Sequence, residues 1–312
     1  MSDSNRVAGG TKRYLGAVAL ALCVTAAAQE LEPRAYSPSP VGTNFLVVGF
    51  GRTTGSVLFD PTIPITDVHA HLKNPAIGLG HTFGLWGRQA LVTALVPYVW
   101  GDIEGQVEEQ EGRVTRSGLA DSRLKLSVNL HGCPAQTPEE FAKVPHRDIL
   151  FGTSLTVQTP DSQYDPTKLV NLGTNRWAIK PEVGISYPWK KVDVDLYGGA
   201  WFFTENSAFY PGTSSRKENP ITTIQAHASY TFRRQLWFAV DGTWYVGGAA
   251  SLNGAPTMGQ QNNSRLGATL SLPLSKRQSL KLAYSAGATA RTGSNFDTLS
   301  VTWQILWFGL RP

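Results

Sequence analysis

The chain has 312 residues and a formal charge of +5, with 31 glycines, nine tryptophans and ten tyrosines. So small a charge does not indicate binding to nucleic acid or to anionic lipid. Long helical patterns are nearly absent, and no apolar run beyond the N-terminal region approaches the roughly 20 residues of a membrane-spanning helix. A membrane protein of this composition has to cross with strands.

The N-terminal region has the three parts of a secretory signal peptide. Residues 6–13 carry three basic side chains, residues 14–24 form a short apolar core, and residues 26–28 are alanines. We expect cleavage after residue 28 and export of the mature chain. Removing residues 1–28 lowers the formal charge to +3 and leaves Cys133 as the only cysteine, so no intramolecular disulfide can form.

Strand patterns then alternate with connections that are short, then long. We expect residues 29–42 to form a short periplasmic segment, residues 43–308 an antiparallel barrel of about twelve strands, and residues 309–312 a tail. The predicted strands cover residues 43–52, 68–83, 88–101, 121–131, 148–159, 175–187, 191–204, 220–232, 235–248, 262–273, 278–291 and 296–308.

The lengths of the connections favour an outer-membrane β-barrel, which has short periplasmic turns and longer extracellular loops. The short connections are predicted at residues 84–87, 188–190, 233–234 and 274–277. The longer ones are predicted at residues 53–67, 102–120, 160–174, 205–219 and 249–261. An even strand number places both termini in the periplasm.

One link, residues 132–147, is long where a short turn is expected. Thr137 can cap a helix, with Pro138 at its first position and Glu140 at its third. We therefore predict a short helix over residues 137–144 that decorates a periplasmic turn. A lid that gates the periplasmic mouth of the barrel is the alternative.

Alternation of polarity with period two supports the strands. Leu124 and Leu126 share one face of a strand, and Arg123 and Lys125 share the other. A soluble β-sandwich also alternates, but the tryptophans favour a membrane, because indole rings prefer the two lipid headgroup interfaces. Eight tryptophans are predicted near strand ends, on the periplasmic side Trp86, Trp189, Trp237 and Trp307 and on the extracellular side Trp100, Trp177, Trp201 and Trp244.

Four strings of the sequence are distinctive. They are YDPTKLVNLGTNRW at residues 164–177, Pro181-Glu182, NSRLG at residues 263–267 and SLKLAYS at residues 279–285. With them the chain resembles, from about residue 44 to residue 308, the outer-membrane transporter family named after the meta-pathway of phenol degradation. The resemblance implies an outer-membrane barrel that admits small, often aromatic, organic molecules. Related hydrocarbon channels have an N-terminal hatch, for which residues 29–42 are too few.

Charged residues on the faces opposite the apolar ones are expected to face the lumen, because an arginine or lysine facing lipid at mid-depth costs roughly 2–4 kcal/mol. They would either select solutes or form an ion-pair network that fills a narrow barrel. The pore-lining candidates are Arg123, Lys125, Arg176, Lys180, Glu182, Asp193, Asp195, His227, Asp241, Arg265 and Lys281.

No motif predicts an enzyme, a cofactor or a metal site. There is no Gly-x-Ser-x-Gly elbow, Walker loop or dinucleotide-binding turn. His69 and His71 share a strand face without a completing cluster, and the acidic run from Glu104 to Glu111 is expected to be a solvated loop.

The predicted function is a channel for passive uptake of small organic solutes across the bacterial outer membrane, with outer-membrane lipids as its surroundings and no nucleic-acid partner. The alternatives are a closed, non-conducting structural barrel and, third, an outer-membrane lipid hydrolase that uses His227. The oligomeric state is left open.

Overall fold

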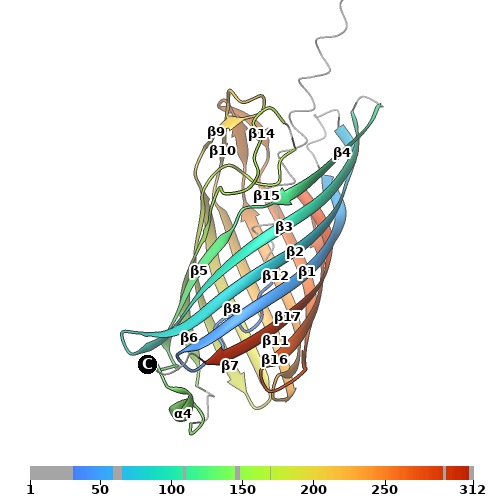
Figure 1. Cartoon of the computed structure of the whole chain (residues 1–312). Coiled ribbons are helices and arrows are strands. Elements are labelled where there is room, and N and C mark those ends of the chain that lie inside the picture. Colours follow the sequence, from blue (N-terminus) through green and yellow to red (C-terminus); the bar gives the residue numbers. More distant parts are fainter. Residues whose placement is uncertain are drawn as a thin grey trace, which may run out of the picture.

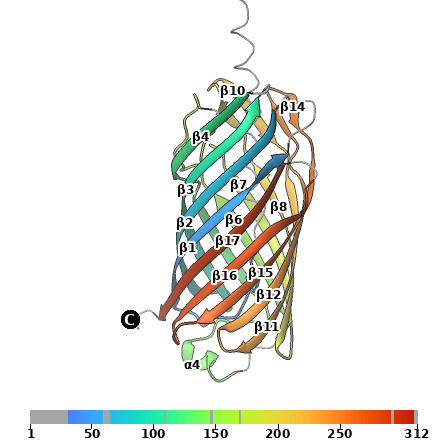
Figure 2. The ribbon, with the colours of Figure 1, turned by 90° about the vertical axis from the view of Figure 1, so that its right-hand side faces the viewer.

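The computed structural model describes residues 31–58, 65–107, 110–144, 148–168, 170–290 and 293–308. These residues form a closed antiparallel β-barrel with twelve strand positions in its wall, as predicted (Figures 1 and 2). β4 and β5 share one position, because both pair with β3. The wall strands are β1 (Thr43–Leu58), β2 (Ile65–Leu85), β3 (Arg88–Val107), β4 (Gln110–Leu119), β5 (Arg123–His131), β6 (Leu150–Gln158), β7 (Ala178–Trp189), β8 (Val192–Phe203), β11 (Ile221–Arg233), β12 (Leu236–Gly247), β15 (Gln261–Pro273), β16 (Gln278–Thr289) and β17 (Gly293–Phe308). The predicted signal peptide, residues 1–28, and the tail, residues 309–312, lie outside the described residues.

The barrel closes where β1 pairs with β17. The register begins with Thr43 opposite Phe308 and continues along both strands. Around the ring, each of the twelve strand positions pairs with the next one along the chain, so the backbone N–H and C=O groups of the wall bond to one another. A closed sheet of this kind leaves no open edge, which is what a β-structure needs within lipid.

Polarity alternates along the wall in the sense opposite to that of a soluble protein. On β7, Lys180 and Glu182 are buried inside, while Ile179, Val183 and Ile185 are exposed outside. β11 repeats this strict alternation of buried and exposed residues. An apolar outer surface and a polar interior are the pattern of a transmembrane barrel. No helix in the described part of the chain is long and apolar enough to cross a membrane.

One end of the barrel, the turn end, carries the short connections, and all four were predicted. β2 and β3 are joined by Trp86 and Gly87, both with positive φ (51° and 74°), as a two-residue turn between twisted strands requires. The other three turns lie at residues 190–191, 234–235 and 274–277. The predicted helix also lies at this end, as α4 (Pro138–Phe141) (Figure 1). Its capping box between Thr137 and Glu140 is confirmed, but the helix is shorter than residues 137–144.

The opposite end, the loop end, has more strand than the sequence predicted. Residues 53–58 and 102–107, expected in loops, continue β1 and β3. Glu104 therefore lies on a strand and not in a loop, and Arg113 of β4 binds it at 3.5 Å and also binds Asp102. The charged residues that led us to predict a loop here therefore pair across two neighbouring strands.

Two more expected loops at this end form a second, four-stranded sheet. Its strands are β9 (Asn206–Phe209), β10 (Ser214–Glu218), β13 (Ala250–Leu252) and β14 (Ala255–Met258). Residues 159–168 and 170–177, by contrast, are irregular, in agreement with the loop predicted over residues 160–174.

The tryptophans follow the girdle prediction only in part. Trp86 and Trp189 are exposed outside at the turn end. Trp201 and Trp237 were assigned to the girdles, yet they are 0% and 7% exposed and lie inside the barrel. Their predicted positions near strand ends were right, but the alternation turns these two side chains inward, where Lys180 and Arg34 stack on them.

Candidate functional site

The interior of the barrel holds part of the chain itself. Residues 31–42, called here the inner segment, enter from the turn end, where Gly42 N–H donates to the Thr82 carbonyl, and extend into the lumen. This corrects the expectation of a periplasmic segment too short to act as a hatch. Twelve extended residues span up to roughly 40 Å, more than the roughly 30 Å of a bilayer's hydrocarbon core, so a short segment is enough to occupy the lumen.

Arg34 anchors the inner segment. Its guanidinium donates to Asp193 Oδ2 at 2.6 Å, to Thr231 Oγ1 at 2.6 Å and to Ser229 Oγ at 2.8 Å, and its backbone N–H donates to Asp195 Oδ2. Its φ of +64° is uncommon for a residue with a side chain. These four hydrogen bonds hold Arg34 in that conformation.

Tyr36 fits a slot that two glycines create in the wall. Gly152 of β6 lies directly opposite Gly184 of β7. A Cβ atom at residue 152 would lie 2.2 Å from the ring of Tyr36, and one at residue 184 would lie 2.5 Å from it. Glycine in a strand often marks such a close approach. The Tyr36 hydroxyl donates to Ser154 at 3.3 Å and to Glu182 at 3.4 Å.

The wall beside the inner segment, β6–β8 with β11 and β12, is filled by polar side chains and is called here the filled wall. Lys180 Nζ lies 3.1 Å from Glu182 Oε2. His227 Nδ1 lies 2.7 Å from Asp241 Oδ1, and the other oxygen of Asp241 accepts from Thr269 at 2.9 Å. Each of these buried carboxylates therefore has a partner side chain within the wall.

A further buried ion-pair cluster lies at the loop end of the barrel. Glu218 of β10 binds Arg176 at 2.7 Å and Arg216 at 3.0 Å. All three side chains are at most 5% exposed. The pairing fixes the second sheet over the barrel interior.

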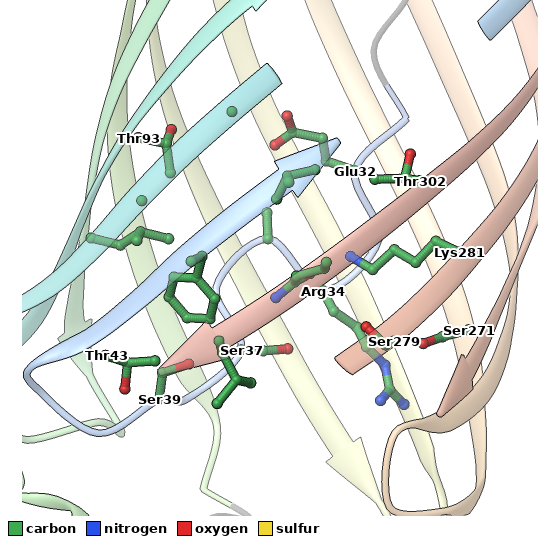
Figure 3. Close-up of a pocket in the computed structure, with 18 of the residues that line it drawn as sticks. Glu32, Arg34, Ser37, Ser39, Thr43, Thr93, Ser271, Ser279, Lys281 and Thr302 are labelled. Carbon is green, nitrogen blue, oxygen red and sulfur yellow. The ribbon is translucent and has the colours of Figure 1, made fainter. Parts of the chain in front are cut away.

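The opposite wall, made of β1–β3, β16 and β17 and called here the open wall, presents small residues to the lumen. Gly78, Gly80, Ala283, Ser300 and Thr302 line a cavity of about 1100 Å³ between this wall and the inner segment (Figure 3).

A second cavity of about 270 Å³ continues toward the loop end, lined by Asn74, Arg265 and Thr298 among others. The two cavities share Leu31, Thr269, Ala283 and Ser300 in their linings, so they adjoin at these side chains.

All eleven candidates from the sequence have side chains inside the barrel, in two groups. Those that line a cavity are Arg123, Lys125, Asp241, Arg265 and Lys281. Those packed away from both cavities, in the filled wall or the loop-end cluster, are Arg176, Lys180, Glu182, Asp193, Asp195 and His227.

Sequence reasoning missed the residues of the inner segment and the buried Glu218. Glu32 illustrates the difficulty, since its carboxylate lies 2.5 Å from Lys125 Nζ, 93 residues away in sequence. The only signal for the inner segment is the pair Gly152 and Gly184, two glycines in strands without a turn to explain them.

Neither a metal site nor a hydrolase triad is assembled within the described residues. No three His, Cys, Asp or Glu side chains there are grouped to hold a metal ion. His227 and Asp241 form the acidic half of a triad, but His227 Nε2 is buried with no hydrogen-bond partner in the described part, so no serine is poised on it.

The closed wall, apolar outside and polar inside, defines the class, a transmembrane β-barrel of the outer-membrane type. The chain belongs to the family described as MetA-pathway of phenol degradation, whose model matches residues 66–307.

Solved structures agree on the fold. The COG4313 outer membrane channel from Pseudomonas putida F1 is similar with a TM-score of 0.75 at 18% identity, covering 89% of this chain and 100% of that one. The β domain of the Bordetella autotransporter BrkA has a TM-score of 0.52 at 12% identity, with 85% and 100% covered. The transport unit of AIDA-I from Escherichia coli has 0.51 at 10%, with 98% and 100% covered. No curated protein matches the chain significantly.

Proposed function

We propose that this chain is a passive channel in the bacterial outer membrane for small organic solutes, aromatic ones among them. Export by the predicted signal peptide brings it there, with the turn end facing the periplasm and the loop end outside. The observation that carries the proposal is the pair of adjoining cavities along the open wall. Together they follow the barrel from the turn end past its middle.

The chemistry of the large cavity supports a solute with both apolar and polar parts. Phe45, Leu91 and Leu95 give it apolar surface, while Ser300 and Thr302 offer hydroxyls. Sites for small molecules combine such mostly apolar walls with a few polar groups. At about 1100 Å³ the cavity exceeds a single-ring compound in size.

The side chains that occupy the lumen along the filled wall favour a second candidate function, a closed structural barrel. The inner segment and the ion pairs of the filled wall occupy that half of the lumen, and barrels of this strand number can be closed by side chains. Enzymatic activity is not proposed, and its absence stays a prediction.

Flux through the refolded mature protein separates the candidates. Heat-modifiable gel migration first establishes that the barrel has formed. Steady conductance in planar bilayers and entry of phenol into liposomes are the expected results. A folded barrel that neither conducts nor admits any solute contradicts the channel and supports the closed barrel.

A pair of variants at adjacent residues tests the route. Thr302 faces the large cavity and Val301 faces outward. Thr302→Trp is expected to lower conductance and flux severalfold, because the indole fills the cavity, whereas Val301→Trp leaves both unchanged. Equal effects of the two changes would place the solute route elsewhere.

A further inference from the structure

The large cavity carries an excess of positive charge. Among its described lining residues five are basic, namely Arg34, Arg123, Lys125, Arg234 and Lys281, and only Glu32 is acidic. Two of the cations have a carboxylate close by, since Asp193 lies 2.6 Å from Arg34 and Glu32 lies 2.5 Å from Lys125. Even with both of these carboxylates counted, the basic side chains outnumber the acidic ones by five to two.

Lys281 differs from those two. It lies on β16 between Ser271 of β15 and Thr302 of β17, and Figure 3 shows its side chain extending from the wall toward the inner segment. Among the described residues no carboxylate forms an ion pair with Lys281, and its Nζ lies 5.8 Å from the centroid of the Trp237 ring. A cation that lines a cavity and has no ion-pair partner of its own can bind an anionic solute there through a charge-assisted hydrogen bond.

The surroundings of Lys281 suit an anion that also has an aromatic ring. The hydroxyls of Ser279 and Thr302 line the cavity beside it and can donate hydrogen bonds to anionic oxygens. The ring of Trp237 has the Arg34 guanidinium over it, 4.8 Å from the centroid, so its orientation is fixed. The apolar side chains of the open wall remain for the rest of the solute.

We infer that the large cavity is a binding site for small aromatic anions, with Lys281 binding the anionic group. This deepens the proposed function by naming the class of solute, and it rests on that function. The site lies on the solute route, so the channel would favour an aromatic carboxylate, sulfonate or phenolate over a neutral or cationic compound of the same size.

Benzenesulfonate is a suitable probe, because it stays anionic at every working pH and does not cross bilayers as a neutral acid. The refolded protein in planar bilayers is expected to show block of the ionic current by benzenesulfonate at concentrations at which benzyl alcohol and benzylammonium have no effect. Lys281→Gln is expected to weaken the block about tenfold, as for loss of one charge-assisted hydrogen bond.

Matched variants separate the site from the general charge of the protein. Lys276→Gln removes the same charge from the exposed turn at residues 274–277, outside the cavity, and is expected to leave the block unchanged. Lys281→Arg keeps the charge and is expected to retain most of the block. Equal block in the wild type and in Lys281→Gln overturns the inference.

The two proposals fail differently. A barrel that conducts and admits benzyl alcohol but shows no preference for benzenesulfonate sinks the anion site and leaves the channel. A barrel that conducts nothing contradicts the channel, and titration calorimetry of benzenesulfonate into the refolded protein in detergent then decides the site. Heat of binding that is lost in Lys281→Gln supports it, and no heat in the wild type overturns it.

Discussion

Tyr36 packs so tightly against two wall glycines that one added methyl group is expected to displace it. In Gly152→Ala the new Cβ would lie 2.2 Å from Tyr36 Cδ1, far inside the roughly 3.5–4.0 Å of favourable carbon contacts. The ring cannot shorten, and β6 is held by its ladder to β5 and β7. Overpacking of this kind costs about 1–3 kcal/mol, which raises the undocked population of the inner segment about 5–150-fold.

Limited proteolysis measures that population. Trypsin cleaves after arginine, and the Arg34 side chain is 17% exposed and bonded to Asp193 in the docked segment. Cleavage at Arg34 in the refolded barrel, read from the mass of the product, therefore requires undocking. The rate is expected to rise 5–150-fold in Gly152→Ala.

Gly198 supplies the control, because a Cβ there would meet nothing within 4 Å. Gly198→Ala is expected to cleave at the wild-type rate. In a Tyr36→Ala background the added methyl has room, so Gly152→Ala is expected to add little. Equal cleavage rates for Gly152→Ala and Gly198→Ala would refute the idea that the slot holds the inner segment in place. So would a Gly152→Ala effect on the cleavage rate that is just as large in the Tyr36→Ala background.

Three further predictions concern charge and capping. Glu218→Gln leaves Arg176 and Arg216 without their carboxylate and is expected to destabilise the folded barrel by about 3–5 kcal/mol. The temperature at which the folded barrel changes its gel migration is therefore expected to fall. An unchanged temperature would contradict a stabilising role of the ion-pair cluster. Lys125 holds the pKa of Glu32, in the inner segment and outside the wall strands, at about 2, below its ordinary 4.5. A lowered pKa contributes stability that is complete above pH 4.5 and lost as the pH falls through about 2. The conductance is therefore expected to stay constant as the pH is lowered from about 6 to about 3.5, and a step near pH 4.5 would contradict the pair. Thr137→Ala removes the capping box of α4 and is expected to cost about 1 kcal/mol locally, seen as faster amide exchange in the helix with unchanged conductance.

Local rules predicted the wall of the barrel from the sequence. Alternation with period two assigned Lys180 and Glu182 to the lumen, and both lie on the inside of β7. Turn lengths gave the strand number, and the capping box at Thr137 gave α4. Each of these signals is contained within a few neighbouring residues.

The contents of the lumen could not be predicted in that way. The side-chain partners of Arg34 lie 159 to 197 residues away along the chain, and no short pattern encodes such a contact. The prediction for Trp237 was wrong for a related reason. Its position near the strand end suggested a place at the headgroup interface, but its neighbours in space are two cations of the lumen. Alternation indicates which side chains face inward, but not which of them meet.

The pairing of β1 with β17 constrains the order of assembly. Thr43 meets Phe308 only after every intervening strand exists, so the ring is completed last. The inner segment bonds to β5, β6, β8 and β11, which lie together on one side of the barrel, away from the β1–β17 seam. Once the ring is complete its wall offers no side entrance. The segment is therefore either enclosed as the first and last strands join or threaded afterwards through the turn end. In both cases the part of the described chain that is synthesised first fills the interior.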